Sequence, residues 1–583
     1  MTDRFSLIVA RSPAGLAGLA EPRPPYPGWA VDRLAPHVFF FRTPRASIIT
    51  WPRGLIIGSL VARGERAPRG HLAPSDSAMI DAKGPAALID CYWGAYVACL
   101  IGVDGCVILV RAPFGDLPCL WHASDSHIVI ASDPELLACH GVAAKPSPPR
   151  LAAYLGRPDY LGNATCLTDI DELRGGEALR IGETGLSHPA ALWSPWRLAA
   201  NERRLLSDPR DAASRVGEAV RLSVAARTVR HPRSLLLLSG GIDSSVVAAS
   251  LANAGRDFTC LNFLSANTGD EERYARLVAD ACDAPFEVGV RNPAGVDLER
   301  SAAAGQPRPV ARAFMQESMR LAGEAANRSG ASAVIDGGGG DSVFYAYLSA
   351  APAADLWRRE GWSAQFRSTV AALAALSGVS RLKVTLRGIA RAQRASQARR
   401  PPLLDYLSAE ARAHVAEAAP HPWLTVPAGV GPGTASYVAG LPPIQGLVET
   451  QDPRGAVAAI APLITQPVVE ACLCVPSWLW FEPWNSRVVV RRAFAEALPP
   501  AIIERRSKGT PESFVAGIFE ARRGQIAALL LDGSLAAMGL LDRQALASAL
   551  AAGSVTRGYA FNRILRLVDA EAWVRSWPAG AAR

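Results

Sequence analysis

Residues 235–245, LLLLSGGIDSS, carry the side chains best suited to phosphate chemistry. Four leucines predict a buried strand that ends in a Ser-Gly-Gly turn, and the apolar residues after position 245 predict a helix. Two glycines let the backbone approach a ligand closely, and the free N–H groups at a helix start attract an anion. Asp243 inside this loop suits a Mg²⁺ ion that bridges phosphate oxygens.

This loop differs from two common nucleotide-binding loops. It lacks the GK[ST] of a Walker loop and the third glycine of the dinucleotide fingerprint. A plain strand–turn–helix is the alternative interpretation. The combination SGG-I-DSS is far more specific than a single glycine-rich turn, so we favour a pyrophosphate site.

A second glycine loop follows at residues 336–341, after the apolar residues 333–335 that predict a strand end. Four consecutive glycines cost about 1 kcal/mol each in a regular element, so they imply a backbone that packs closely against something. Asp336 and Asp341 flank these glycines. We expect Asp243 and Asp341 to hold a metal ion on the pyrophosphate together.

Two regions of the chain, with different sequence patterns, must position these loops. Up to about residue 195, short β-branched and aromatic runs separated by Gly, Pro and Asp predict an antiparallel, β-rich module. From residue 205, amphipathic helices alternate with brief apolar strands, which predicts a parallel sheet with crossover helices and then a helical end. The predicted fold class is therefore a multidomain α/β protein.

Length and charge narrow the range of possible functions. At roughly 150 residues per domain, 583 residues predict two or three domains, and 49% hydrophobic residues exclude general disorder. The net charge of +8 is modest and does not require nucleic acid. Residues 381–400 hold seven basic residues and no acid. They are either a basic arm that meets an acidic peptide or a solvated helix face, and we favour the second interpretation.

The cysteines and the apolar segments predict a cytoplasmic protein. Ten scattered cysteines with no C-x-x-C pair are typical of reduced thiols. The first residues show no secretory signal pattern. The apolar stretch from Ala458 to Phe481 contains three prolines and Glu470, so we expect no membrane insertion.

The motif SGG-I-DSS resembles the pyrophosphate loop of ATP pyrophosphatases. Together with the second glycine loop and the β-rich module, it resembles the asparagine synthetase superfamily over nearly the whole chain. This likeness implies a degenerate class II glutamine amidotransferase-like (Ntn-type) domain at 1–197 and an asparagine-synthetase-like adenylating domain at 205–583. The other similar segments are RAPFGDLPCLWHASDSHIVIASDPELL (111–137), TCLTDIDELRGGEALRI (165–181), DEERYARLVADAC (270–282), PLITQPVVEACLCVP (462–476) and RRSKGTPESF (505–514).

Two departures from the family pattern change the expected reaction. Glutamine-dependent members begin with Met-Cys, whereas this chain begins Met1-Thr2 and lacks the R-G-P-D and N-G-E motifs, so we expect no glutaminase activity. Where asparagine synthetases have Glu and β-lactam synthetases Tyr, this chain has Gly338. With these departures the chain resembles most closely the lasso-peptide macrolactam synthetases.

That resemblance implies an ATP- and Mg²⁺-dependent, AMP-forming ligase. It would adenylate an Asp or Glu side chain of a ribosomal precursor peptide and join it to the peptide's N-terminal amine, alongside a leader-recognising protease as a further partner. The implied catalytic residues are Lys508, Asp243 and Asp341, the last two also binding metal. The implied ATP-binding residues are Leu237, Ser239, Gly240, Gly241, Asp243, Ser244, Ser245, Phe263, Gly337, Gly338 and Gly339.

Two alternative functions and one question of placement stay open at this point. A β-lactam-type or asparagine-type synthetase acting on a small molecule would use the same loops. A non-catalytic peptide-binding scaffold is the alternative from another class, although a scaffold has no need of two metal-binding carboxylates. The tryptophans at 478, 480 and 484 either line a peptide groove or belong to the core.

Overall fold

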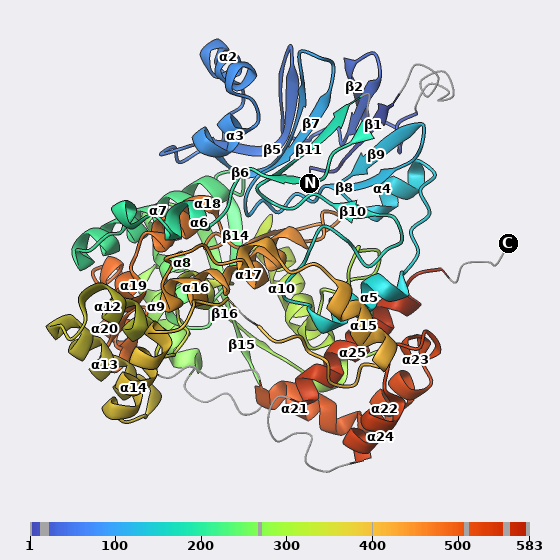
Figure 1. Cartoon of the computed structure of the whole chain (residues 1–583). Helices are drawn as coiled ribbons and strands as arrows, with labels where there is room; N and C mark the ends of the chain where they lie inside the picture. The colour runs from blue at the N-terminus through green and yellow to red at the C-terminus, as the bar shows by residue number, and fades with distance from the viewer. Residues whose placement is uncertain are drawn as a thin grey trace.

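The computed structural model describes residues 3–11, 23–182, 185–265, 271–398, 400–506, 512–551 and 560–578. The first third of the chain forms two antiparallel sheets that face each other, at the top of Figure 1. The first sheet has the order β10 (Asp171–Glu172), β8 (Leu120–Ala123), β9 (His127–Ala131), β1 (Phe5–Ala10), β3 (Val38–Arg42) and β2 (Ala30–Ala35). The second has the order β12 (Gly185–Leu186), β11 (Glu177–Gly182), β7 (Val107–Arg111), β6 (Tyr92–Ile101), β5 (Gly54–Ala62) and β4 (Ile48–Trp51), with β13 (Ala190–Ala191) paired to β11.

Alternate residues of these strands point inward and fill the space between the sheets. Phe5 and Leu7 of β1 pack with Leu55 and Ile57 of β5, and all four are buried. Their neighbours in sequence point the other way, as strand geometry requires. Ile56 faces helix α2 (Pro74–Lys83), α3 (Ala86–Cys91) and the core of the next module. The outer face of the first sheet contacts α4 (Pro134–Cys139) and α5 (Pro148–Gly156).

A five-stranded parallel sheet lies below this sandwich, in the order β16 (Phe286–Val290), β15 (Asp257–Leu264), β14 (Arg233–Leu237), β17 (Ala333–Ile335) and β18 (Ala458–Ile460). Both faces are covered. Leu236 and Cys260 pack against α7 (Pro209–Thr228) and α8 (Ile242–Asn253), whereas Leu235 and Leu261 pack against α10 (Gln316–Ser329). The strand order changes direction between β14 and β17, and ligands of such sheets bind at the carboxyl edge there.

Helices complete the chain in two groups. The group beside the parallel sheet contains α9 (Glu271–Ala281), α11 (Gly340–Val343), α12 (Ala351–Glu360), α13 (Ala364–Ser377), α14 (Arg381–Ala392), α16 (Pro432–Val438), α17 (Leu441–Glu449), α18 (Gln466–Leu473), α19 (Val488–Ala493) and α20 (Pro500–Ile503). The C-terminal group returns to α5 and contains α15 (Ala409–Glu417), α21 (Glu512–Ala521), α22 (Arg523–Leu531), α23 (Ser534–Ala537), α24 (Arg543–Ala551) and α25 (Ala560–Arg575) (Figure 1). The predicted fold class is confirmed.

Buried ion pairs join the N-terminal sheets to the rest of the chain. Glu172 accepts hydrogen bonds from the guanidinium groups of Arg111, at 2.7 Å, and Arg308, and all three side chains are buried. Glu449, the last residue of α17, accepts bonds from Arg174 Nε at 2.5 Å and from the Gly175 amide at 2.7 Å. These contacts hold residues far apart in sequence at fixed positions.

Within the described residues, no single helix is long and apolar enough to cross a membrane. By length and composition alone, α13 and α14 pass that test only as a pair, and they are bent by 117° at the break between them.

Candidate active site

The two glycine loops meet at the carboxyl edge of the parallel sheet. Residues 238–241 follow β14 and residues 336–339 follow β17, its hydrogen-bonded neighbour. A Cβ atom on Gly337 would lie 2.6 Å from the amide nitrogen of Ser244, and one on Gly340 would lie 2.5 Å from Asp243 Cγ. Only glycine allows this approach, which is the physical reason for the glycine run between Asp336 and Asp341.

The first loop has the backbone that its glycines predict. Gly240 has a φ of +66°, and a Cβ atom there would lie 2.6 Å from the Ala275 amide nitrogen. The hydroxyl of Ser244 accepts a hydrogen bond from the Ser239 amide at 3.2 Å, and that of Ser245 donates to the Gly241 carbonyl at 2.8 Å. These bonds fix the turn so that the start of α8 is aimed at the edge of the sheet.

Asp243 and Asp341 converge on one cation. The Nη1 atom of Arg487 lies 2.7 Å from Asp243 Oδ2 and 2.6 Å from Asp341 Oδ1. The Asp243 side chain is buried, whereas that of Asp341 is 63% exposed. The structure therefore brings together the two carboxylates that sequence analysis paired, around a guanidinium that it missed.

This carboxylate pair fits a magnesium ion. Mg²⁺ is usually bound by one or two carboxylates together with substrate phosphates and water. Among the described residues there is no group of three or more His, Cys, Asp or Glu side chains that could hold a metal without help from a ligand. Asp243 and Asp341 therefore match a metal that arrives with a nucleotide.

Basic side chains line a pocket beside the first loop. It encloses about 430 Å³ of space that is partly open to solvent, and its wall includes the backbone of Gly241 and Ile242 at the start of α8. Such a wall of cations and helix N–H groups suits a polyphosphate. Its other lining residues are Leu376, Trp484, Asn485, Ser486, Arg487, Arg491, Arg505 and Arg506.

The arginines of this pocket are held in place by the surrounding backbone. Arg491 donates to the carbonyls of Ser486, Ile502 and Arg505, and burial, with the nearby Arg487 charge, lowers its pKa to about 10. Arg487 has a left-handed backbone with φ +58°, and its buried Nε atom has no hydrogen-bond partner among the described residues.

Arg505 is not the solvated charge that its neighbours in the sequence suggest. It is buried, donates to the Gly240 carbonyl at 2.9 Å, and lies over the Tyr274 ring at 4.0 Å. Arg505 thus clamps the first loop against α9. Arg506 is exposed beside Trp484. No motif in the sequence marks Arg487, and the family-like segment 505–514 does not reveal the contact that Arg505 makes with Gly240, because both contacts are with loops more than 200 residues away.

Gly338 occupies a position where a side chain would meet a carboxylate. Its amide donates to Asp336 Oδ1 at 2.8 Å, and a Cβ atom on Gly338 would lie 2.8 Å from the same oxygen. Burial raises the pKa of Asp336 above its ordinary value. Gly339 has a φ of +74° and contacts Ile464. A side chain at position 338 would therefore collide with the Asp336 carboxylate.

Leu237 and Phe263 lie at the ends of β14 and β15, on the face of the sheet that α10 covers. Both are partly exposed, and Asn262 of β15 donates to the Leu238 carbonyl at 2.7 Å. They therefore border the loops from the side opposite α8.

Two predicted positions lie outside the described residues: Thr2 and Lys508. The three tryptophans divide between the two interpretations. Trp480 is buried against Phe344, and Trp478 is partly buried beside Arg359, whereas Trp484 is 55% exposed and lines the basic pocket. Only Trp484 is therefore available to a ligand there.

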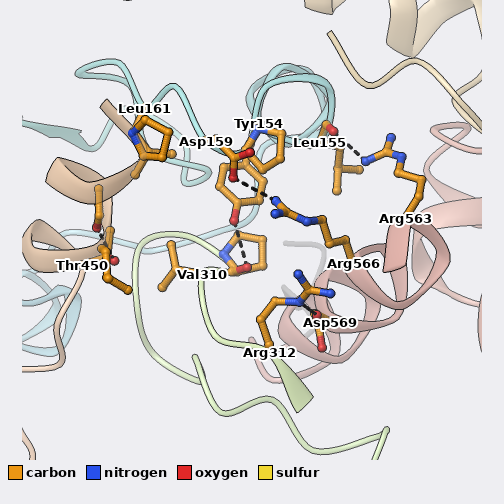
Figure 2. Close-up of a pocket in the computed structure, with 15 residues that line it drawn as sticks. Tyr154, Leu155, Asp159, Leu161, Val310, Arg312, Thr450, Arg563, Arg566 and Asp569 are labelled. Atoms are coloured by element: carbon orange, nitrogen blue, oxygen red, sulfur yellow. Dashed lines mark hydrogen bonds and ion pairs between the residues drawn. The ribbon is translucent and has the colours of Figure 1, made fainter. Parts of the chain in front are cut away.

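A larger pocket, of about 760 Å³ and partly open, lies where α5, α17 and α25 meet (Figure 2). Its charged groups are mostly satisfied by each other. Arg312 pairs with Asp569 at 2.7 Å, Arg566 pairs with Asp159 at 3.1 Å, and Arg563 donates to the Leu155 carbonyl. Ile444, on another face of α17, lies 3.3 Å from the Cβ position of Gly339. This pocket contains none of the predicted phosphate residues.

The contacts of Arg487 with both carboxylates lead to a prediction for metal binding. We expect Arg487→Gln to bind Mn²⁺ without nucleotide about tenfold more tightly than the unaltered protein, because a charge-assisted contact worth about 1.5–3 kcal/mol no longer competes for the two carboxylates. Electron paramagnetic resonance of free Mn²⁺ measures this affinity. Arg492→Gln, at an exposed arginine paired with Glu482, is the control. Equal Mn²⁺ affinity in Arg487→Gln and the unaltered protein would contradict the competition.

Comparison with known proteins finds a family model, described as asparagine synthase, that matches residues 215–575. No curated protein matches the sequence. Among solved structures, the chain is similar to the glutamine phosphoribosylpyrophosphate amidotransferase of B. subtilis complexed with ADP and GMP, at 11% identity and a TM-score of 0.17 over 44% of this chain and 52% of that one. It is also similar to an allosteric regulatory enzyme of purine biosynthesis, at 11% identity and a TM-score of 0.19 over 57% and 68%. The chain thus spans about half the length of the first.

Proposed function

Because the chain belongs to the asparagine synthase family, whose members are ATP-dependent carbon–nitrogen ligases, we propose that it is an AMP-forming macrolactam synthetase. It adenylates the side chain of an Asp or Glu in a ribosomal precursor peptide. The peptide's own N-terminal amine then displaces AMP, and the product is an isopeptide-closed ring. The observation that carries the ATP-dependent step is the convergence of Asp243, Asp341 and Arg487 at the junction of both glycine loops.

The reaction needs activation because a carboxylate is a poor electrophile at neutral pH. In this proposal the amides and hydroxyls of residues 239–245 hold the pyrophosphate of ATP, and the start of α8 faces its negative charge. Asp243 and Asp341 would hold Mg²⁺, which neutralises charge on the phosphate oxygens. Arg487 and the fixed guanidinium of Arg491 supply further positive charge as the bond between the α and β phosphates breaks.

Gly338 supports a peptide amine as the nucleophile. A glycine there leaves no Glu or Tyr side chain to act on a small substrate. An α-amine has a pKa near about 8, so part of it is already unprotonated at neutral pH and no strong base is needed. Placement is the larger effect, because a well-oriented intramolecular reaction reaches effective molarities on the order of 10⁵ M. Asp336 is the carboxylate nearest this position and can accept the proton that the amine releases.

The test is to incubate the full-length protein with ATP, Mg²⁺ and a candidate precursor peptide. We expect AMP together with a peptide lighter by one water. AMP with an unaltered peptide would contradict the proposal and leave the β-lactam-type or asparagine-type alternative. No ATP turnover with any peptide or amino acid would favour the scaffold. The protein is also expected to release no glutamate from glutamine, and glutamine hydrolysis would overturn the interpretation of Thr2.

A second prediction concerns the activity of a Lys508 variant. If this lysine faces the α-phosphate, as the family resemblance implies, Lys508→Ala removes a compact cation that stabilises the reacting phosphate. We expect loss of product by about 10²-fold or more, with ATP binding retained. Product mass and ATP affinity measure the two effects. The matched control is Lys83→Ala, at an exposed lysine that ends α2. Full activity of Lys508→Ala would remove this residue from the mechanism.

A further inference from the structure

One segment of this chain carries a formal net charge equal to that of the whole chain. Residues 361–404 contain eight basic residues and no Asp or Glu. The whole chain has 61 basic and 53 acidic residues, so the remainder carries 53 of each and is formally neutral. The basic residues of the segment are Arg367, Arg381, Lys383, Arg387, Arg391, Arg394, Arg399 and Arg400.

Helix α14 carries four of these eight basic residues together with two exposed leucines. Val384 and Gly388 are buried, and the Cβ position of Gly388 lies 3.3 Å from Ala353 Cβ of α12. On the outward face, Leu382 is 68% exposed and Leu386 is 58% exposed. These two leucines are four residues apart, so they are neighbours on the helix surface. Figure 1 shows α14 at the edge of the molecule, away from the N-terminal sheets and from α25.

Exposed cations flank the two leucines. Arg381, Lys383 and Arg387 are all exposed, and none has an ion pair among the described residues. Single exposed leucines are common on protein surfaces, but adjacent leucines bordered by unpaired cations, on a helix without any acid, are typical of helices that lie in a membrane interface. Basic side chains contact anionic headgroups there, while the apolar side chains enter the acyl boundary.

We propose that α14 is a docking face for an anionic lipid surface. Leu382 and Leu386 enter the headgroup boundary, and Arg381, Lys383 and Arg387 bind lipid phosphates. This contact is peripheral and requires no spanning helix. It is independent of the proposed reaction, because α14 contributes no residue to the basic pocket. Two other partners fit less well, since nucleic acid or an acidic peptide would use the cations but gain little from two leucines on an outward helix face.

The experiment measures co-sedimentation of the full-length protein with vesicles. We expect binding to vesicles of phosphatidylglycerol and phosphatidylcholine in equal parts, and at least about tenfold weaker binding to phosphatidylcholine alone, since each basic residue near an anionic surface contributes about fivefold in affinity. The double variant Leu382→Ser/Leu386→Ser should bind the mixed vesicles about tenfold less tightly or worse. Val103→Ser, at a valine 92% exposed on the N-terminal module, is the control and should bind normally.

The charge variant Lys383→Glu/Arg387→Glu should also lose binding, and added salt should weaken binding of the unaltered protein. Thermal unfolding checks that every variant is folded. Equal binding to both kinds of vesicle, or none to either, would overturn the proposal. Vesicle binding that depends on the cations but survives loss of both leucines would also overturn it, because such a face would be purely electrostatic and would accept an acidic polymer such as poly-glutamate equally well.

Discussion

Replacing Asp243 with Asn should lower the rate of AMP formation by about 10²–10³-fold, the usual cost of removing one preorganised group that acts on transition-state charge. Asp243 is buried in the first turn of α8, and its Oδ2 atom lies 2.7 Å from Arg487. Asn keeps the shape of the side chain but not its charge. The metal would then lose a ligand, and the pyrophosphate would be less well neutralised when the bond to AMP breaks.

Two measurements separate this effect from a general disturbance. ATP binding without Mg²⁺ should survive in Asp243→Asn, because the lost charge repels phosphate when no metal is present. The control is Asp257→Asn, at the opposite edge of the same sheet, where the aspartate is exposed and pairs with Arg233. It should form AMP at the normal rate. If Asp243→Asn does so too, the carboxylate has no part in phosphate chemistry.

The second large effect is on stability. We expect Glu172→Ala to lower the free energy of unfolding by about 3–5 kcal/mol, because it leaves Arg111 and Arg308 buried without their shared counter-charge. The shift of the urea-unfolding midpoint measures this loss. Glu287→Ala removes the partner of Arg328 in an exposed ion pair and should cost less than about 1 kcal/mol. Similar shifts in both variants would mean that the buried ion pairs contribute no more to the free energy of unfolding than the exposed pair does.

The same cluster predicts how stability depends on pH. Burial alone would raise the pKa of Glu172, but the charges of Arg308 and Arg111 hold it at about 2, below its ordinary value of 4.5. A carboxyl whose pKa is depressed by folding stabilises the protein fully above the unfolded pKa. That stabilisation is lost as the pH falls from 4.5 toward 2. The difference between the unaltered protein and Glu172→Ala should therefore be full near neutral pH and shrink across this range.

The parts of the site that local sequence dictates were predictable. The strand, the two glycines and the helix start follow one another along the chain, so the loop after β14 can be predicted from residues 235–245 alone. Four glycines in a row imply a close approach, and the structure supplies its partner in the amide of Ser244. Asp243 and Asp341 were paired because each belongs to a glycine loop and suits a metal ion, and the structure brings them together because the parallel neighbours β14 and β17 end at one edge of the sheet.

The parts that depend on distant contacts were not predictable. Arg487 follows no motif, and only the packing of α19 beside the sheet brings it to both carboxylates. Arg505 is surrounded by charged residues in the sequence, as a solvated residue would be, yet it is buried against Gly240. The place of the Asp336 carboxylate beside Gly338 depends on a turn of the loop that its composition does not specify.

Helix α17 has a consequence for how this protein can evolve. Its last residue, Glu449, is bonded to Arg174 and Gly175 of the N-terminal module, and its Ile444 supports Gly339 in the second glycine loop. The loop thus rests on contacts that both modules share. We therefore expect that replacing the N-terminal module by another would disturb the second glycine loop unless the pair of Arg174 and Glu449 is kept.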